Sequence, residues 1–165
     1  MLSWNLDRAS CETLDVILDE VLDRANDIYA FQEIGQHFEK YECKFPGSRV
    51  VYSTSRTEAL VVSPSLVSMI HDVSSWNGGV AVRLWDETES TGASQRNGVV
   101  VSSCYFPQVG LGMEKYVEAI HDAETKLHQL ILPKDQLLLA CDANTTLQQC
   151  EPLTGDLAWN ASAND

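Results

Sequence analysis

Basic residues and long apolar runs are what this sequence has least of. The 165 residues include 11 lysines and arginines against 24 aspartates and glutamates, which gives a formal charge of −13. A field of this sign repels nucleic acid, so the composition argues against a protein that binds nucleic acid by charge alone. A helix needs about 20 consecutive apolar residues to cross a bilayer, and no such run occurs. We therefore expect no membrane span.

Closely spaced cysteine pairs and an export signal are missing as well. No two of the five cysteines have the C-x-x-C spacing of a zinc or redox site, so we expect reduced thiols. The first residues, MLSWNLDR, lack the basic start and apolar core of a signal peptide. An intracellular location is the default expectation, without a choice between nucleus and cytoplasm.

Two segments have the periodicity of amphipathic helices. Residues 10–26 place leucines, isoleucine and valine on one stripe with acids opposite, and Ser10 is a suitable N-cap. Residues 113–132 show a second apolar stripe, and Pro133 closes that segment because proline cannot continue a helix. The sequence therefore predicts two helices about a hundred residues apart.

Short β-branched and aromatic segments lie between and after these helices, bounded by Gly, Pro, Ser and Asn. They are DIYAFQEI, RVVYS, EALVVS, GGVAVRLW, NGVVVSSCYFP and QLLLACD. The last is nearly continuous in apolar residues, as strands buried on both faces are, which predicts a layered α/β fold. We expect one domain over residues 1–150 and an irregular tail over residues 151–165, where the periodicity is lost.

Polar residues stand at the ends of three apolar segments. They are Asn5 in LSWNL, Glu33 in YAFQEIG, and Asp142 with Asn144 in LLLACDANT. Ligands of α/β sheets bind beyond the carboxyl ends of the strands, so these side chains can converge on one site. Carboxylates with amides suit Mg²⁺, which takes oxygen ligands, and asparagine can donate hydrogen bonds to phosphate. This combination indicates metal-assisted attack on a phosphate.

Each of these residues also has an ordinary structural explanation. Asn5 alone is more often a turn residue than a ligand, and Glu33 alone is usually a solvated acid. Asp142 and Asn144 fit a helix cap or an Asx-turn. Only the order and context of the whole set favour a shared site.

Taken in order, LSWNL, the acidic helix, DIYAFQE, GGVAVRL, VVVSSCYFP and LLLACDAN resemble the endonuclease/exonuclease/phosphatase superfamily, which includes retroelement endonuclease domains. The resemblance covers residues 2–146. It implies the DNase I-like α/β sandwich, with two β-sheets flanked by helices. It also implies a Mg²⁺-dependent phosphodiester hydrolase, with Mn²⁺ as an alternative ion, acting on nucleic acid or another phosphodiester.

The resemblance also assigns roles to single residues. It makes Glu33 the Mg²⁺ ligand, with Asn5 ordering both the metal and the phosphate as a metal-binding and catalytic residue. Tyr105, in CYFP, corresponds to a tyrosine near the scissile phosphate. Asp142 corresponds to the acid that orients or deprotonates the attacking water, and Asn144 to the amide that contacts the phosphate.

Two departures from the family pattern bear on activity. Cys141 and Ala143 stand where the family has Gly and Phe. The family's closing Ser-Asp-His motif has no counterpart, because all four histidines precede Asp142. Of these, His71 alone stays a candidate for the site, whereas His121 and His128 on the second helix are expected to be exposed or to lie at the edge of the core.

The chain thus resembles about the first two thirds of the family domain. We expect one face of GVAVRLW and GVVVSSCY to lack its cover, leaving an apolar surface through which the chain self-associates. For this chain alone we expect weak Mg²⁺ binding and negligible nuclease activity. A non-catalytic remnant or acidic binding module of the same fold is the alternative, and a protein-interaction domain without a phosphate site is a third hypothesis.

Overall fold

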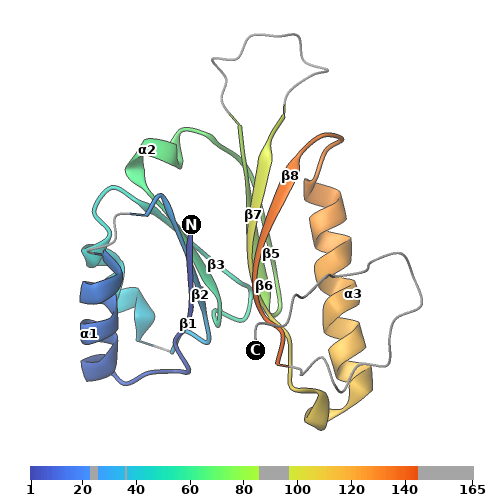
Figure 1. Ribbon diagram of the computed structural model, residues 1–165, viewed down its shortest axis with the longest axis horizontal. Helices are drawn as coiled ribbons and strands as arrows, with labels where there is room; N and C mark the ends of the chain where they lie inside the picture. Colours follow the sequence, from blue (N-terminus) through green and yellow to red (C-terminus); the bar gives the residue numbers. More distant parts are fainter. Residues whose placement is uncertain (23–25, 36, 86–96, 145–165) are drawn as a thin grey trace, which may run out of the picture.

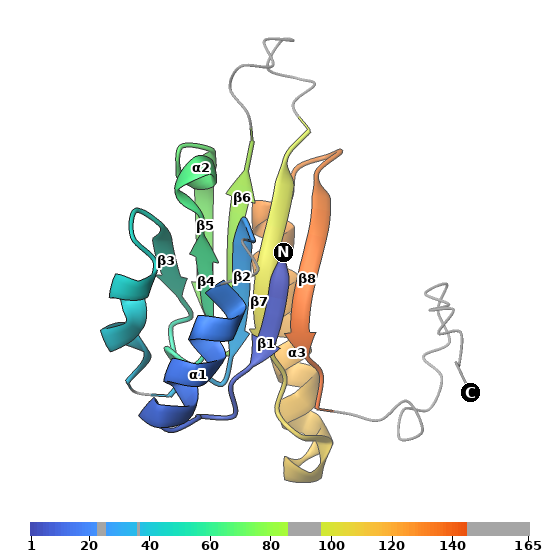
Figure 2. The same cartoon turned by 60° about the vertical axis from the view of Figure 1, so that its left-hand side comes forward.

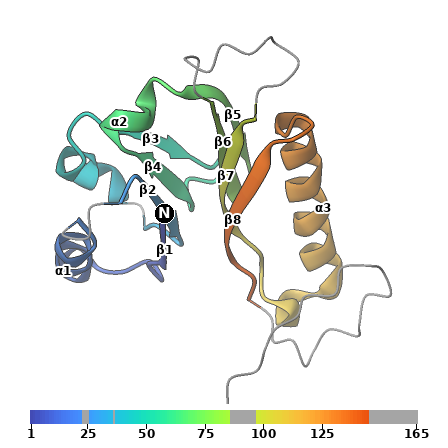
Figure 3. The same cartoon turned by 45° about the horizontal axis from the view of Figure 1, so that its top comes forward.

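The computed structural model describes residues 1–22, 26–35, 37–85 and 97–144. They form four layers, with a helix on the outside of each of two four-stranded sheets (Figure 1). Figure 3 shows the two long helices on opposite sides of the paired sheets. The predicted layered sandwich is therefore confirmed. The tail predicted over residues 151–165 lies outside the described residues, as does Cys150.

The first sheet has the strand order β1-β2-β4-β3, with β1 and β2 parallel and the other pairs antiparallel. Its strands are β1 (Leu2–Asn5), β2 (Ile28–Gln32), β3 (Arg49–Tyr52) and β4 (Ala59–Val62). Its outer face is covered by α1 (Cys11–Leu22) and the 3-10 helix η1 (Phe38–Lys44). The short helix α2 (Pro64–Val67) leads on to the second sheet.

Helix α1 begins where the sequence predicts. The Ser10 hydroxyl accepts the Thr13 N–H at 3.3 Å and the Ser10 carbonyl accepts the Leu14 N–H at 2.8 Å, which confirms Ser10 as the cap. The predicted end at residue 26 is wrong, because Asn26 is not helical; residues 23–25 lie outside the described part. Helix ends are the least certain part of a periodicity argument.

The second sheet has the order β5-β6-β7-β8, with β7 and β8 parallel and the other pairs antiparallel. Its strands are β5 (Ile70–Trp76), β6 (Gly79–Leu84), β7 (Val99–Tyr105) and β8 (Gln136–Asp142). The 3-10 helix η2 (Val109–Leu111) and α3 (Met113–Leu130) connect β7 to β8, and α3 covers the outer face. Helix α3 ends two residues before the predicted end, since the residue preceding Pro133 disfavours helical backbone.

An apolar core fills the space between the sheets, and a buried polar bridge crosses it. The amide N–H of Gln32 in β2 donates to the Ser103 hydroxyl of β7 at 2.9 Å, and this hydroxyl donates to the Phe31 carbonyl at 3.1 Å. Gln32 is only 2% exposed, so its amide depends on these partners and on Ser3, whose hydroxyl donates to it at 3.3 Å. The bridge holds the sheets together directly beneath the residues that follow β2.

The exposed apolar surface is not where the sequence predicts it. All six residues of β6 are buried and β7 is buried except at its ends, because the first sheet covers one face and α3 the other. The expectation that these two strands lack cover is therefore wrong. The surface lies instead on β8, whose Leu137, Leu138 and Leu139 are 42–45% exposed. Since β8 is an edge strand of its sheet (Figure 2), its predicted burial on both faces is also wrong.

A buried ion pair fixes the connection from α3 to β8. The Arg83 Nε of β6 lies 2.6 Å from the Asp135 Oδ2, and both side chains are at most 1% exposed. Asp135 also accepts backbone N–H groups of Gly98 and Leu132, each at 2.8 Å. The Arg83 hydrogen bond, more than any other contact, holds the pKa of Asp135 below its ordinary value. The segment just before β8 is thereby tied to Arg83 of β6 and to the residue that precedes β7.

Candidate functional site

Three side chains predicted from strand ends meet at one point. The Asn5 side-chain amide donates to Glu33 Oε1 at 3.1 Å and also to Asp142 Oδ2. Asn5 ends β1, Glu33 follows β2 and Asp142 ends β8, and β1 and β8 run in the same direction in Figure 2. One amide therefore joins a carboxylate of the first sheet to a carboxylate of the second.

The side-chain oxygen of Asn5 sets the orientation of its amide group. Its side-chain oxygen accepts the Asp7 N–H at 2.8 Å, so the amide N–H groups face the two carboxylates. In this orientation Asn5 holds Glu33 and Asp142 close together. A direct metal contact from the oxygen of Asn5 stays a prediction.

Tyr105 and Asn144 lie beside these three residues. Tyr105 is the register partner of Asp142 in the parallel pair β7–β8. The Asn144 backbone N–H donates to Asp142 Oδ1 at 3.1 Å, which is the Asx-type contact weighed above, and its side chain donates to the Phe106 carbonyl at 3.0 Å. Asn144 thus links the ends of β7 and β8, while its contact with a phosphate stays a prediction.

The pKa of Tyr105 depends on its burial and on the charged side chains near it. Burial, followed by the carboxylates of Glu33 and Asp142, raises the pKa of Tyr105 above its ordinary value, and Arg8 lowers it. The phenol is therefore protonated at neutral pH and available as a hydrogen-bond donor. Its position in the field of both carboxylates agrees with the predicted place beside the site.

Most of the non-glycine residues with left-handed backbone in the described part of the chain lie in or next to the candidate site. Asp7, Arg8, Glu33 and Asn144 have φ between 46° and 51°, and they are four of the six such non-glycine residues in the described part of the chain. This conformation costs free energy for residues with a side chain and persists only where surrounding contacts enforce it. The Arg8 N–H, for example, donates to the Glu33 carbonyl at 2.8 Å. The two turns that carry the first-sheet half of the site therefore support each other.

Glu58 is a residue of this region that the sequence does not reveal. It is fully buried directly before β4, and its Oε1 has no hydrogen-bond partner among the described residues. Burial is the main cause that raises the pKa of Glu58, and Glu33 contributes in the same direction. The sequence around Glu58 is that of an ordinary acidic residue before a strand. Nothing in the neighbouring residues indicates that other segments of the chain bury this side chain.

No histidine takes part in the site. His71 lies within β5, not after a strand, and near the far end of the second sheet, where its ring centre lies 3.6 Å from that of Trp85 with the two rings tilted by 38°. This removes His71 as a candidate. His121 and His128 are exposed on α3, as expected, and His37 is exposed before η1.

The two acids of the site fit a hard cation. Within the described residues no ion pair neutralises Glu33 or Asp142, and no group of three or more acidic, histidine or cysteine side chains is placed to hold a metal ion. Mg²⁺ commonly takes only one or two carboxylates from a protein and keeps several waters. Two carboxylates held around one amide match that donor set, although Mg²⁺ binding itself stays a prediction.

The fold is shared with several solved structures. The endonuclease domain of TRAS1, a telomere-specific non-LTR retrotransposon, matches with a TM-score of 0.55 and 22% identity over 88% of this chain. A humanized D. rerio TDP2 with 14 mutations matches with a TM-score of 0.64 and 12% identity over 88%. An endonuclease/exonuclease/phosphatase family protein from Bacteroides thetaiotaomicron matches with 0.55 and 17% over 86%.

These likenesses establish the fold. The present chain spans 60%, 66% and 62% of the three matched chains, in the order given. No protein-family model matches the sequence, and no curated protein matches it either. The chain has the DNase I-like fold that the sequence motifs predict.

Proposed function

We propose that this chain carries the metal-binding and water-activating residues of a phosphodiester hydrolase of the endonuclease type. The observation that carries the proposal is the contact of one amide, that of Asn5, with carboxylates from both sheets. Residues separated by 137 positions meet there, at the edge of the fold where ligands of such sheets bind. The retrotransposon endonuclease among the structural matches supports nucleic acid as the substrate.

The proposed chemistry divides the work between the two carboxylates. Glu33 would hold Mg²⁺, or Mn²⁺ as an alternative, and the ion would supply Lewis-acid polarisation of a phosphate oxygen. Asp142 orients a water molecule and accepts its proton as the water oxygen bonds to phosphorus, while the P–O bond to the leaving oxygen breaks and that oxygen takes a proton from solvent. Asn5 holds the two carboxylates at a fixed separation. Tyr105 and Asn144 donate hydrogen bonds to phosphate oxygens.

The activity of the chain alone is proposed to be very low. None of its four histidines contacts the site, so no imidazolium donates to the charge that develops on the phosphate. Loss of one such donor typically lowers kcat by about 10²–10³. The same observation favours the second candidate function, a module that binds a phosphodiester without turnover.

Ion binding tests the proposal directly. We expect Mn²⁺ titrations to show weak binding that Glu33→Gln and Asp142→Asn each weaken at least about tenfold, because each removes one carboxylate. Glu118→Gln, which changes an exposed acid on α3, is the matched control. Equal affinities in all four proteins would overturn the metal site.

Plasmid nicking and abasic-site cleavage with Mg²⁺ then separate the two candidates. Slow cleavage that both site variants abolish supports the hydrolase. Oligonucleotide binding without any cleavage supports the binding module. Cleavage that neither variant alters contradicts the assigned residues.

Two further expectations concern partners and location. Within the described residues, no helix combines the length and the apolar character that crossing a bilayer requires. Self-association is proposed to involve the exposed leucines of β8, in place of the faces of β6 and β7. The intracellular location expected from the first residues stays a prediction.

A further inference from the structure

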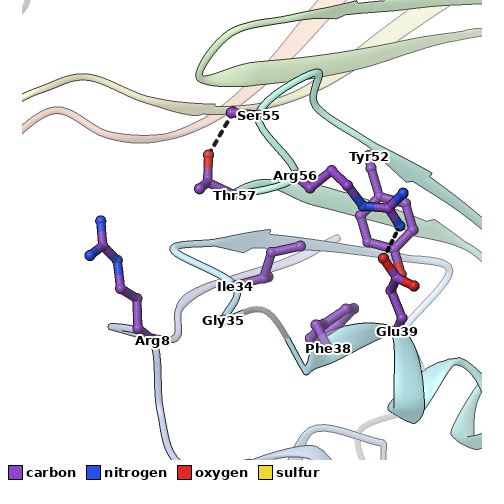
Figure 4. A pocket seen from close by; sticks show the side chains of 9 residues that line it. All are labelled: Arg8, Ile34, Gly35, Phe38, Glu39, Tyr52, Ser55, Arg56 and Thr57. Atoms are coloured by element: carbon purple, nitrogen blue, oxygen red, sulfur yellow. Dashed lines mark hydrogen bonds and ion pairs between the residues drawn. The ribbon is translucent and has the colours of Figure 1, made fainter.

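A second concave feature borders the candidate site. A pocket of about 430 Å³ is enclosed by the turns after β1 and β2, by η1 and by the β3–β4 loop. Its lining residues are Arg8, Ile34, Gly35, Phe38, Glu39, Tyr52, Ser55, Arg56 and Thr57 (Figure 4). Ile34 and Gly35 directly follow Glu33 in the chain. The pocket and the carboxylates therefore share one turn.

The two sides of the pocket have different chemistry. Figure 4 shows Arg8 standing alone on one side, and no ion pair holds its guanidinium among the described residues. On the other side the Arg56 guanidinium lies 4.6 Å from the centre of the Tyr52 ring and pairs with Glu39. One wall thus offers an unpaired cation, and the other offers a flat guanidinium stacked on an aromatic ring.

The floor and the rim complete the pocket. The apolar side chains of Ile34 and Phe38 line the floor, and the core packs around the rest of their surface, which leaves them 3% and 1% exposed. At the rim, the hydroxyls of Ser55 and Thr57 lie 2.7 Å apart. An anionic group fits beside Arg8, whereas a planar ring fits against the floor and the face of Arg56. A nucleotide combines these two features in one molecule.

Charge and size narrow the choice of ligand. Two of the chain's 11 basic residues line this pocket against one acid, so it carries a local charge of the sign opposite to the net charge of −13. Its volume lies near the lower end of the range of about 300–1,000 Å³ typical of small-ligand pockets. That space admits one nucleotide with its base turned outward from the strand, and it excludes a base pair.

The position of Arg8 connects the pocket to the site. Its backbone N–H is bound to the Glu33 carbonyl, and its charge acts on Tyr105. A phosphate held by Arg8 is therefore near the residues proposed to attack a phosphodiester. On a strand, neighbouring phosphates are joined by one sugar, so a pocket in this place suits the nucleotide next to the scissile bond.

We propose that this pocket binds one unpaired nucleotide of a nucleic-acid strand, with its phosphate on Arg8 and its base against Arg56 and the apolar floor. The inference rests on the proposed function, because it places the scissile phosphodiester at Asn5, Glu33 and Asp142. A pocket for an unpaired nucleotide makes single-stranded nucleic acid, or the frayed end of a duplex, the preferred substrate. A fully paired duplex cannot place a base in the pocket.

Oligonucleotide binding in EDTA tests the pocket apart from the metal. We expect Arg8→Gln to weaken binding of a fluorescent oligothymidylate about tenfold, as loss of one charged phosphate contact does. The slope of log K against log salt should become shallower by about 0.7. Arg49→Gln, an exposed arginine of β3 outside the pocket, is the control for net charge. Equal losses in both variants would overturn the assignment to Arg8.

A second variant tests the base contact. Arg56→Lys keeps the charge and removes the flat surface, so it should weaken oligothymidylate binding several-fold and leave binding of an abasic oligonucleotide of the same length unchanged. Equal losses for both ligands would contradict base stacking. Thymidine monophosphate should bind more weakly with the same dependence on Arg8, and a blunt duplex that binds as well as the single strand would overturn the proposal.

The two proposals fail in different ways. If the metal site is wrong, Glu33→Gln leaves Mn²⁺ binding unchanged while Arg8→Gln still weakens oligonucleotide binding in EDTA. If the pocket is wrong, Arg8→Gln binds the oligonucleotide as the parent chain does, while the Mn²⁺ titrations still separate Glu33→Gln from its control.

Discussion

Strands β6 and β8 belong to the same sheet, and their burial is the reverse of what their compositions indicate. Strand β6, GVAVRL, contains an arginine and is buried at every position. Strand β8, QLLLACD, contains three consecutive leucines, and all three are exposed. The difference is position, since β6 lies between two neighbouring strands and two covering layers, whereas β8 is an edge. An apolar strand is buried only where other elements cover it.

The buried guanidinium of Arg83 in β6 predicts the largest effect on the free energy of unfolding. Asp135→Ala leaves the Arg83 guanidinium buried without its carboxylate, and breaking such a pair costs about 3–5 kcal/mol of unfolding free energy. Urea unfolding measures this loss. Arg83→Met combined with Asp135→Leu should recover much of it, because no unpaired charge is then buried.

An exposed ion pair is the matched control for that variant. Lys44 pairs with Asp15 and Asp19 at the surface, and Lys44→Ala should cost less than about 1 kcal/mol. Similar losses in the two single variants would contradict the difference between a buried pair and an exposed one.

The leucines of β8 predict a smaller effect on stability and a clear effect on association. Leu139→Thr should change the unfolding free energy by less than about 0.5 kcal/mol, because the side chain is 44% exposed. Leu60→Ala, in fully buried β4, should cost about 2–5 kcal/mol. Sedimentation velocity should show less self-association for Leu139→Thr than for the parent chain. An unchanged sedimentation profile would remove β8 as the contact surface.

The buried Glu58 beside the first sheet predicts a change in stability that depends on pH. Glu58 has a raised pKa, so its contribution to stability is complete below its ordinary value of 4.5 and is lost as pH rises through the raised value. Glu58→Gln removes this titration. It should therefore be more stable than the parent chain at pH 8, by about 1–3 kcal/mol, with a smaller difference at pH 5.

Thermal unfolding in EDTA at the two pH values measures the effect of Glu58→Gln. Glu118→Gln controls for the loss of one exposed acid. A difference that stays constant or narrows from pH 5 to pH 8 would show that Glu58 is ionised in the folded chain across this range. Asp135 is buried too, but its pKa is lowered because Arg83 pairs with it.

Several features could be predicted from the sequence because they depend on neighbouring residues. Spacing and local preference predict the Ser10 cap and the helices that begin near Cys11 and Met113. They also predict the strands β2, β3, β4, β6, β7 and β8. The order of motifs also predicted the DNase I-like fold. The convergence of Asn5, Glu33 and Asp142 was predictable because parallel strands carry their carboxyl ends to the same edge.

Other features were decided only by the tertiary structure, since they depend on which distant segments pack against each other. Nothing near Glu58 in the sequence indicates complete burial, and nothing near His71 shows that it lies far from the site. Arg8 and Arg56 become two walls of one pocket only when the turns after β1 and β2 meet the β3–β4 loop. Local sequence determines which strands form, whereas the covering layers determine which strands and charges are buried, because burial free energy depends on the surface removed from water.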